Sequence, residues 1–117
     1  MARGDIILVD LPQPAGTPGH EQTGNRPALI IHEDATINVY SVIMVVPFTS
    51  RLNAQRFPHT ILVQPSAING LNAASVLLIF QLRAIDKARI QKTIGRLEPD
   101  IMRQVDIEIK QLLGLLP

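Results

Sequence analysis

Short runs of apolar and β-branched residues, each ended by proline, glycine or a polar turn, recur along most of this chain. They cover residues 4–11, 28–32, 39–49, 59–64 and 76–82. Runs of this length and composition are typical of β-strands, whereas a surface helix shows a longer segment with helical periodicity. The sequence therefore predicts about five short strands. The last run is apolar apart from Gln81, which predicts a strand that is buried on both faces.

The C-terminal segment changes to the period of a helix. Glu98 and Pro99 occupy the positions where an N-cap and a first helical residue belong. An apolar stripe follows at helical spacing and consists of Ile101, Met102, Val105, Ile109, Leu112 and Leu113. Ile107 is the only apolar residue of the predicted helix that lies outside this stripe. The predicted fold is mainly β (β-rich α+β), a small barrel with a C-terminal α-helix, in a single domain over residues 1–117.

Residues 12–25 are the least regular segment of the chain, with three prolines and three glycines. Neither a helix nor a central strand accommodates that composition. Loops of this length are uncommon in small domains and tend to bind ligands or cover active sites. We therefore expect this loop to contribute to a functional site.

Composition excludes several classes of protein. The chain of 117 residues has no cysteine, which excludes disulfides, thiolate zinc sites and cysteine nucleophiles. No apolar run approaches the roughly 20 residues of a membrane span, and the N-terminus does not resemble a secretory signal. We expect a soluble cytoplasmic protein. The hydrophobic fraction of 46% is high for so short a chain and favours a homodimer over a tightly packed monomer.

Charge is distributed unevenly along the chain. The segment 51–97 contains seven basic residues and one acidic residue, whereas the segments before and after it are net acidic. A basic region of this kind could meet phosphates or an acidic partner, or it could be scattered over the surface and only solvate it. Only four aromatic residues are present, so a stacking platform for single-stranded nucleic acid would be thin.

Few residues have the context that catalysis requires. The three histidines lack the spacing of a metal site; we expect His32 and His59 to be structural, whereas His20 in the long loop is a candidate ligand-binding residue. Arg26 and Thr49 lie at strand ends, where a guanidinium and a hydroxyl could flank one phosphate. The alternative is that the arginine satisfies loop carbonyls and that the threonine merely favours a strand.

Five blocks of sequence in register resemble the MazF/PemK family of bacterial toxins, which are type II toxin–antitoxin endoribonucleases. The matching blocks are Arg3-Gly-Asp-Ile6 with Val9-Asp10, Gly19-His-Glu-Gln-Thr-Gly-Asn-Arg-Pro27, Pro47-Phe-Thr-Ser50, Gly70-Leu71 with Ser75 and Gln81-Leu-Arg-Ala-Ile-Asp-Lys-Ala-Arg89, and Ile94-Gly-Arg-Leu97. The resemblance covers nearly the whole chain.

This resemblance implies an SH3-like barrel, a homodimer and sequence-specific cleavage of single-stranded RNA (an mRNA interferase) without a metal or other cofactor. It also implies a cognate antitoxin whose disordered tail folds onto the toxin. By position in the motifs, Arg26 and Thr49 match the catalytic pair of the family. Residues implied to shape the site or to contact RNA are His20, Glu21, Gln22, Ser50, Arg51, Gln81 and Arg83.

One departure from the family pattern and two alternatives qualify this interpretation. Phe80 stands where many members carry an aspartate, which removes any base contact made by that acid. A CcdB-like toxin of the same fold, which binds DNA gyrase, would be expected to have a C-terminal aromatic anchor, whereas this chain ends Gly-Leu-Leu-Pro. The other alternative is an inactive member that only binds its antitoxin and regulates their shared promoter.

Overall fold

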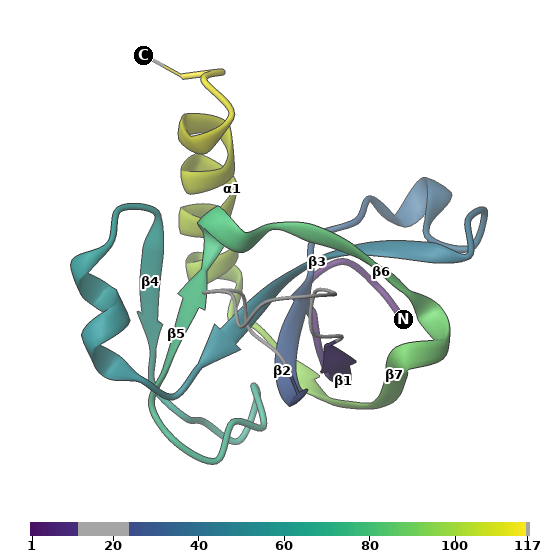
Figure 1. The fold of residues 1–117 in the computed structure, drawn as a ribbon, viewed down its shortest axis with the longest axis horizontal. Helices are drawn as coiled ribbons and strands as arrows, with labels where there is room; N and C mark the ends of the chain where they lie inside the picture. Colours follow the sequence, from purple (N-terminus) through teal and green to yellow (C-terminus); the bar gives the residue numbers. More distant parts are fainter. Residues whose placement is uncertain (12–23, 117) are drawn as a thin grey trace, which may run out of the picture.

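The computed structural model describes residues 1–11 and 24–116 (Figure 1). The described part contains seven strands: β1 (Asp5–Leu11), β2 (Gly24–Ile30), β3 (Val42–Thr49), β4 (Thr60–Val63), β5 (Ser75–Leu78), β6 (Arg83–Asp86) and β7 (Ile90–Arg96). It also contains the helix α1 (Pro99–Leu112) and the 3₁₀ turns η1 (Asp34–Thr36), η2 (Leu52–Arg56), η3 (Ile79–Gln81) and η4 (Lys87–Arg89). The predicted mainly-β class with a C-terminal helix is confirmed.

Strand β3 joins two parts of the sheet. All pairings are antiparallel, in the order β4-β5-β3-β2-β1-β7, and β6 pairs with the first half of β3. The ladder between β2 and β3 ends where Ala28 lies opposite Pro47, and the next two residues of β3 pair with β5 instead. Proline lacks an amide hydrogen and therefore suits the position where the strand changes partner. Figure 1 shows β3 running from the part of the sheet that contains β2 to the part that contains β5.

Strand β1 is covered on both faces, which explains its apolar composition. Ile6 belongs to the larger core cluster, whereas Ile7 and Val9 belong to a second cluster on the opposite face. The larger cluster includes Leu29, Val46, Phe48, Leu77, Ile79 and Val105, and the second includes Ala28, Ile30, Ile43, Val45 and Ile85. A continuous apolar run is therefore what this strand requires.

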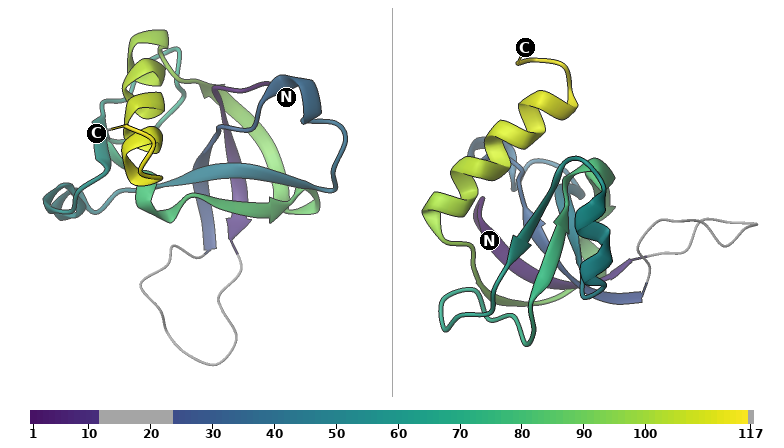
Figure 2. Two further views of the ribbon diagram at one scale, coloured as in Figure 1. Left: turned by 90° about the horizontal axis from the view of Figure 1, so that it is seen from above. Right: turned by 90° about the vertical axis from the view of Figure 1, so that its left-hand side faces the viewer.

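The helix packs its predicted stripe on the larger cluster. Val105 is fully buried, and four further members of the stripe pack around it: Ile101, Met102, Ile109 and Leu112. Ile107 is 50% exposed, as its position outside the stripe predicts. Leu113 was wrongly included in the stripe, because the helix ends at Leu112 and the side chain of Leu113 is exposed. In Figure 2 the C-terminal end of α1 projects beyond the strands.

The number of strands differs from the prediction. The run 76–82 is not one buried strand: β5 ends at Leu78, a 3₁₀ turn follows in which Phe80 is exposed, and β6 then pairs with β3. Strand β7 was missed because most of its side chains are polar and exposed. It forms because its backbone pairs with β1, where Ile90 lies opposite Val9 and Arg96 lies opposite Asp5.

Candidate functional site

The strand ends of β2 and β3 open into a cleft of about 650 Å³. Past the last pair of their ladder, β3 turns toward β5, so the two strands separate. Arg26, Thr49 and Ser50 line this first cleft, together with residues 70–73 and 92–94. The structure therefore brings the arginine, the threonine and the serine that the sequence singled out into one place.

Arg26 lies on β2, which pairs with β1 at this residue and with β3 only from Ala28 onward. It is half-buried and stands opposite Val9 in the ladder with β1. Its neighbour Asn25 accepts a hydrogen bond from Gln91 Nε2 at 2.9 Å, which ties the end of β2 to β7. Lys92 of β7 lines the same cleft, so two basic residues, Arg26 and Lys92, contribute to its lining. A site with this charge favours an anionic ligand such as a phosphate.

Thr49 is held in place by its own loop. The side chain is 3% exposed, and its Oγ1 accepts a hydrogen bond from the backbone N–H of Arg51 at 3.2 Å. A hydroxyl that accepts one hydrogen bond can still donate its proton to another acceptor. Thr49 is thus oriented by the turn that follows β3 and can donate to a phosphate oxygen in the cleft.

Two further clefts continue from the first. The second, of about 490 Å³, is lined by Thr49, Arg51, Asn53, Ala54, Arg56, Phe57, Leu78, Phe80 and Gln81. The third, of about 420 Å³, is lined by Phe80, Gln81, Leu82, Arg83 and Ala84. Thr49 is shared by the first and second clefts, and Phe80 and Gln81 by the second and third. The three clefts are therefore neighbours on the molecule, an arrangement that suits an extended polymer.

All six predicted site residues that the structure describes line one of these three clefts. Arg51 and Gln81 line the second cleft, and Gln81 and Arg83 line the third. His20, Glu21 and Gln22 lie outside the described residues. Sequence reasoning missed Lys92, Arg56 and the two phenylalanines. The excess of basic residues in the segment 51–97 indicated that cations could contribute to a site, but nothing in the sequence placed Lys92 and Arg56 near Thr49.

The other two histidines make structural contacts, as predicted. His32 Nδ1 accepts from the backbone N–H of Met44 at 3.2 Å, and its Nε2 lies 3.0 Å from Thr36 Oγ1. His59 Nδ1 lies 2.9 Å from Glu108 Oε2 and so links the start of β4 to α1. Within residues 1–11 and 24–116, no group of three or more histidine, cysteine or acidic residues is placed to hold a metal ion.

The loop that contributes residues 70–73 to the first cleft is fixed by a buried asparagine. Asn69 Oδ1 accepts from the backbone N–H groups of Ser66 and Leu71, each at 3.0 Å. Its Nδ2 donates to Gln64 O at 2.9 Å and to Glu98 Oε1 at 3.0 Å, which ties the loop to the residue preceding α1. All the hydrogen-bonding capacity of a fully buried amide is therefore used to hold this loop.

Close backbone packing also fixes this loop. A Cβ atom on Gly95 would lie 2.3 Å from the carbonyl carbon and oxygen of Asn69, and one on Gly70 would lie 2.0 Å from the carbonyl oxygen of Ile94. Only glycine fits at these two contacts. The loop at residues 64–73 consequently packs closely against β7, and residues 70–73 of this loop line the first cleft.

The fold and the clefts together define a class: a small β-protein with neighbouring clefts, lined in part by basic residues, at the ends of its strands. The comparisons with known proteins identify the family. The sequence model of one protein family, described as the PemK-like, MazF-like toxin of type II toxin–antitoxin systems, matches residues 2–113. A protein of Staphylococcus saprophyticus named endoribonuclease MazF is 36% identical over 116 residues, which cover 98% of this chain and 92% of that protein. The chain belongs to the PemK-like, MazF-like toxin family.

Solved structures agree with this assignment. MazF from Deinococcus radiodurans (Form-I) superposes with a TM-score of 0.77 at 26% identity, covering 97% of this chain and 96% of that one. In the MazE–MazF structure from the same organism (Form-II), the matching chain gives a TM-score of 0.75 at 26% identity, with 99% and 97% covered. The barrel fold implied by the motifs is thereby confirmed. No helix in the described part of the chain is long and apolar enough to cross a membrane.

Proposed function

We propose that this chain is the toxin of a type II toxin–antitoxin system and acts as an endoribonuclease on single-stranded RNA. The observation that carries the proposal is that Arg26 and Thr49, from two different strands, line one cleft. The relative from Staphylococcus saprophyticus, which matches over nearly its whole length, is named an endoribonuclease. The neighbouring clefts that share Thr49 give an RNA strand room to pass through the site.

The reaction assigned to the site is an internal transfer at phosphorus. The ribose 2′-hydroxyl loses its proton and attacks the adjacent phosphorus, and the bond from phosphorus to the 5′-oxygen breaks as that oxygen gains a proton. The products are a 2′,3′-cyclic phosphate and a free 5′-hydroxyl. The pentacoordinate state between them carries extra negative charge on its equatorial oxygens, so the site must supply fixed positive charge and hydrogen-bond donors.

Arg26 supplies the charge in this scheme. An arginine guanidinium is cationic and can contact two phosphate oxygens at once. We therefore assign Arg26 to charge stabilisation rather than to proton transfer. Thr49 donates a hydrogen bond that orients the same phosphate, since its hydroxyl is already fixed by the Arg51 backbone. Ser50, Arg51 and Lys92 are placed to hold the neighbouring phosphates.

Several parts of the family scheme stay predictions for this chain. Glu21 and His20 are assigned to the shaping of the site, with Glu21 pairing with Arg26. A cognate antitoxin is proposed as partner, because the similar Deinococcus radiodurans structure is a MazE–MazF structure. A homodimer is proposed from the apolar surplus of the chain, and a cytoplasmic location is proposed from its membership of the toxin family. The gyrase-binding alternative, which has the same fold, is not favoured because the chain matches the PemK-like, MazF-like family and a relative named an endoribonuclease.

Incubation of the pure protein with a long transcript in excess chelator tests the proposal. We expect discrete fragments that carry 2′,3′-cyclic phosphate and 5′-hydroxyl ends, because no step of the scheme uses a metal. RNA that stays intact would overturn the nuclease proposal. Arrest of DNA gyrase under matched conditions would favour the gyrase-binding class instead, and intact RNA without arrest would favour the inactive, antitoxin-binding class.

A further inference from the structure

Two of the four aromatic residues of the chain lie side by side in the second cleft. The ring centroids of Phe57 and Phe80 are 5.8 Å apart, and the ring planes are tilted by 59°. Both rings are substantially exposed, at 45% and 40%. Exposed aromatic residues that cluster next to a cationic groove are a recurrent feature of surfaces that bind single-stranded nucleic acid.

The two rings are held by the backbone around them. Phe57 and Phe80 lie just outside the ends of the β4–β5 ladder, where Thr60 pairs with Leu78. The Thr60 hydroxyl donates to the carbonyl of Phe57 at 2.9 Å, and the backbone N–H of Ile79 donates to the carbonyl of His59 at 3.1 Å. The aromatic pair is therefore preorganised, which lowers the entropic cost of binding to it.

The geometry of the pair determines where a base could stack. Insertion of a base between two parallel rings needs a separation of roughly 7 Å, which a tilted pair at this distance does not offer. The guanidinium of Arg56 lies over the ring of Phe57, 4.8 Å from its centroid. One face of Phe57 is consequently occupied, and the exposed ring of Phe80 is the better platform.

We propose that Phe80 is a stacking platform for one nucleobase of the RNA next to the cleaved linkage, with Phe57 as its side wall. This inference rests on the proposed function, since it requires an RNA strand at Thr49. Thr49 lines both the first and the second cleft, so a nucleotide adjacent to a phosphate held by Thr49 enters the cleft that holds the two rings. The amides of Asn53 and Gln81 line the same cleft and can contact the edge of the base.

Charge complementarity favours RNA over an apolar peptide as the occupant. Arg51 and Arg56 line the second cleft beside the rings, and Arg83 lines the third. A nucleotide presents an aromatic base and an anionic phosphate within one unit, which matches a ring flanked by guanidinium groups. An apolar protein segment would cover Arg51 and Arg56 without supplying a counter-charge, which is unfavourable.

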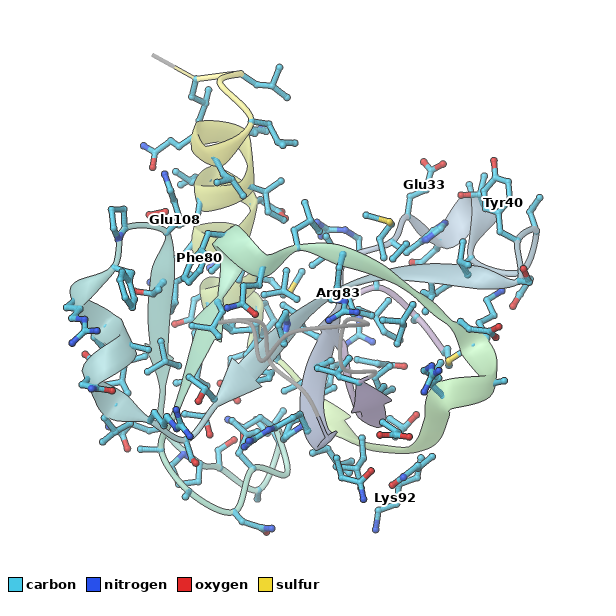
Figure 3. The ribbon with its side chains drawn as sticks, in the orientation of Figure 1. Glu33, Tyr40, Phe80, Arg83, Lys92 and Glu108 are labelled. Atoms are coloured by element: carbon cyan, nitrogen blue, oxygen red, sulfur yellow. The ribbon has the colours of Figure 1, made fainter. Side chains whose placement is uncertain are left out.

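A single-tryptophan reporter tests the platform directly. The chain contains no tryptophan, so Phe80→Trp introduces the only indole. In a background that carries Arg26→Ala to prevent cleavage, the variant is titrated with single-stranded oligoribonucleotides of mixed sequence. Stacking of a base on the indole should quench its fluorescence. Tyr40→Trp in the same background is the matched control, because Tyr40 is 54% exposed at the far side of the molecule from Phe80 (Figure 3); it should show no quenching.

Removal of the ring gives the second readout. Phe80→Leu keeps an apolar side chain but abolishes stacking, and we expect roughly tenfold weaker binding of the same oligonucleotides and restoration by Phe80→Tyr. Tyr40→Leu should bind as the unmodified chain does. The proposal would be overturned if Phe80→Leu bound RNA with unchanged affinity and the fluorescence of Phe80→Trp was not quenched. The same result is expected if Phe80 contacts a protein partner instead of RNA.

A parallel cleavage assay on the unmodified chain separates the two proposals. Cleavage without quenching at Phe80→Trp would refute the stacking platform and leave the nuclease function in place. Quenching without cleavage would support the platform and refute the nuclease function.

Discussion

Arg26 and Thr49 line one cleft because the ladder between their strands ends before it reaches them. The last pair of that ladder is Ala28 opposite Pro47, after which β3 leaves β2 and pairs with β5. Because the two strands separate there, both residues line an opening large enough for a nucleotide. The break in the sheet, at a proline, is thus what makes room for the proposed substrate.

Removal of the Arg26 guanidinium should abolish cleavage with little effect on stability. Arg26 is half-buried at a strand end, outside both core clusters, so we expect Arg26→Ala to change the melting temperature by only a few degrees. Loss of a charge that stabilises the transition state should lower kcat/KM by at least about 100-fold. Arg26→Lys keeps the charge without the forked contact and should retain a small fraction of the rate. Cleavage at the normal rate by Arg26→Ala would remove this residue from the mechanism.

Thr49→Val tests the hydroxyl at nearly constant volume. The Arg51 N–H loses its acceptor, which should lower the free energy of unfolding by about 1 kcal/mol. Cleavage should fall by about 100-fold, because the valine cannot donate to the phosphate. Thr49→Ser keeps the hydroxyl and serves as the control. Equal cleavage rates for the valine and serine variants would show that the hydroxyl has no part in the reaction.

Lys92 should contribute to RNA affinity through charge alone. It is exposed on β7 and lines the first cleft, so it is placed to neutralise one phosphate. Lys92→Ala should weaken oligoribonucleotide binding and reduce the slope of log K against log salt concentration by about 0.7, the value for one contact to a single strand. Lys110→Ala, an exposed position near the end of α1, is the control. Identical salt slopes for the two variants would place Lys92 outside the binding surface.

Two isoleucines on α1 test the orientation of the helix. Ile109 packs against the larger core cluster, whereas Ile107 is half exposed on another face. Ile109→Asp should lower the free energy of unfolding by about 2–3 kcal/mol more than Ile107→Asp does, because only the former buries an unpaired charge. Urea denaturation of both variants measures the difference. Equal losses would mean that the faces of the helix are assigned incorrectly.

Asn69 should be among the most important polar residues for stability. Asn69→Ala removes four hydrogen bonds and leaves the buried N–H of Leu71 without its acceptor, so we expect a loss of about 3 kcal/mol. Asn72→Ala, an exposed neighbour in the same loop, should change stability by less than about 0.5 kcal/mol. Denaturant midpoints of the two variants provide the comparison. A small effect at Asn69 would contradict its assigned role in fixing the loop to α1.

The sequence predicted best those elements whose own pattern of apolar and polar residues determines the type of secondary structure. β1 reads as a strand because both of its faces are buried, and α1 reads as a helix because Pro99 and the stripe around Val105 mark its start and its apolar side. β7 has no such pattern. Its side chains are mostly polar, and its conformation follows from pairing with β1, which is information that lies elsewhere in the chain.

The same distinction applies to the site. Arg26 and Thr49 were found because they lie in motifs of a known family, and the fold then brought them to one cleft. A stacking platform was expected to contain few aromatic side chains, since only four aromatic residues are present in the chain. Composition cannot show that Phe57 and Phe80 lie side by side, because that depends on the pairing of β4 with β5.

The central claim is that Arg26 and Thr49 act on the same phosphate, and a double-mutant cycle tests it most directly. Cleavage of one RNA substrate is measured under single-turnover conditions for the unmodified chain, Arg26→Lys, Thr49→Val and the double variant. If both side chains contact one phosphate, the double variant should lose markedly less than the product of the two single losses. Losses that multiply fully would show that the two residues act independently and would contradict the account.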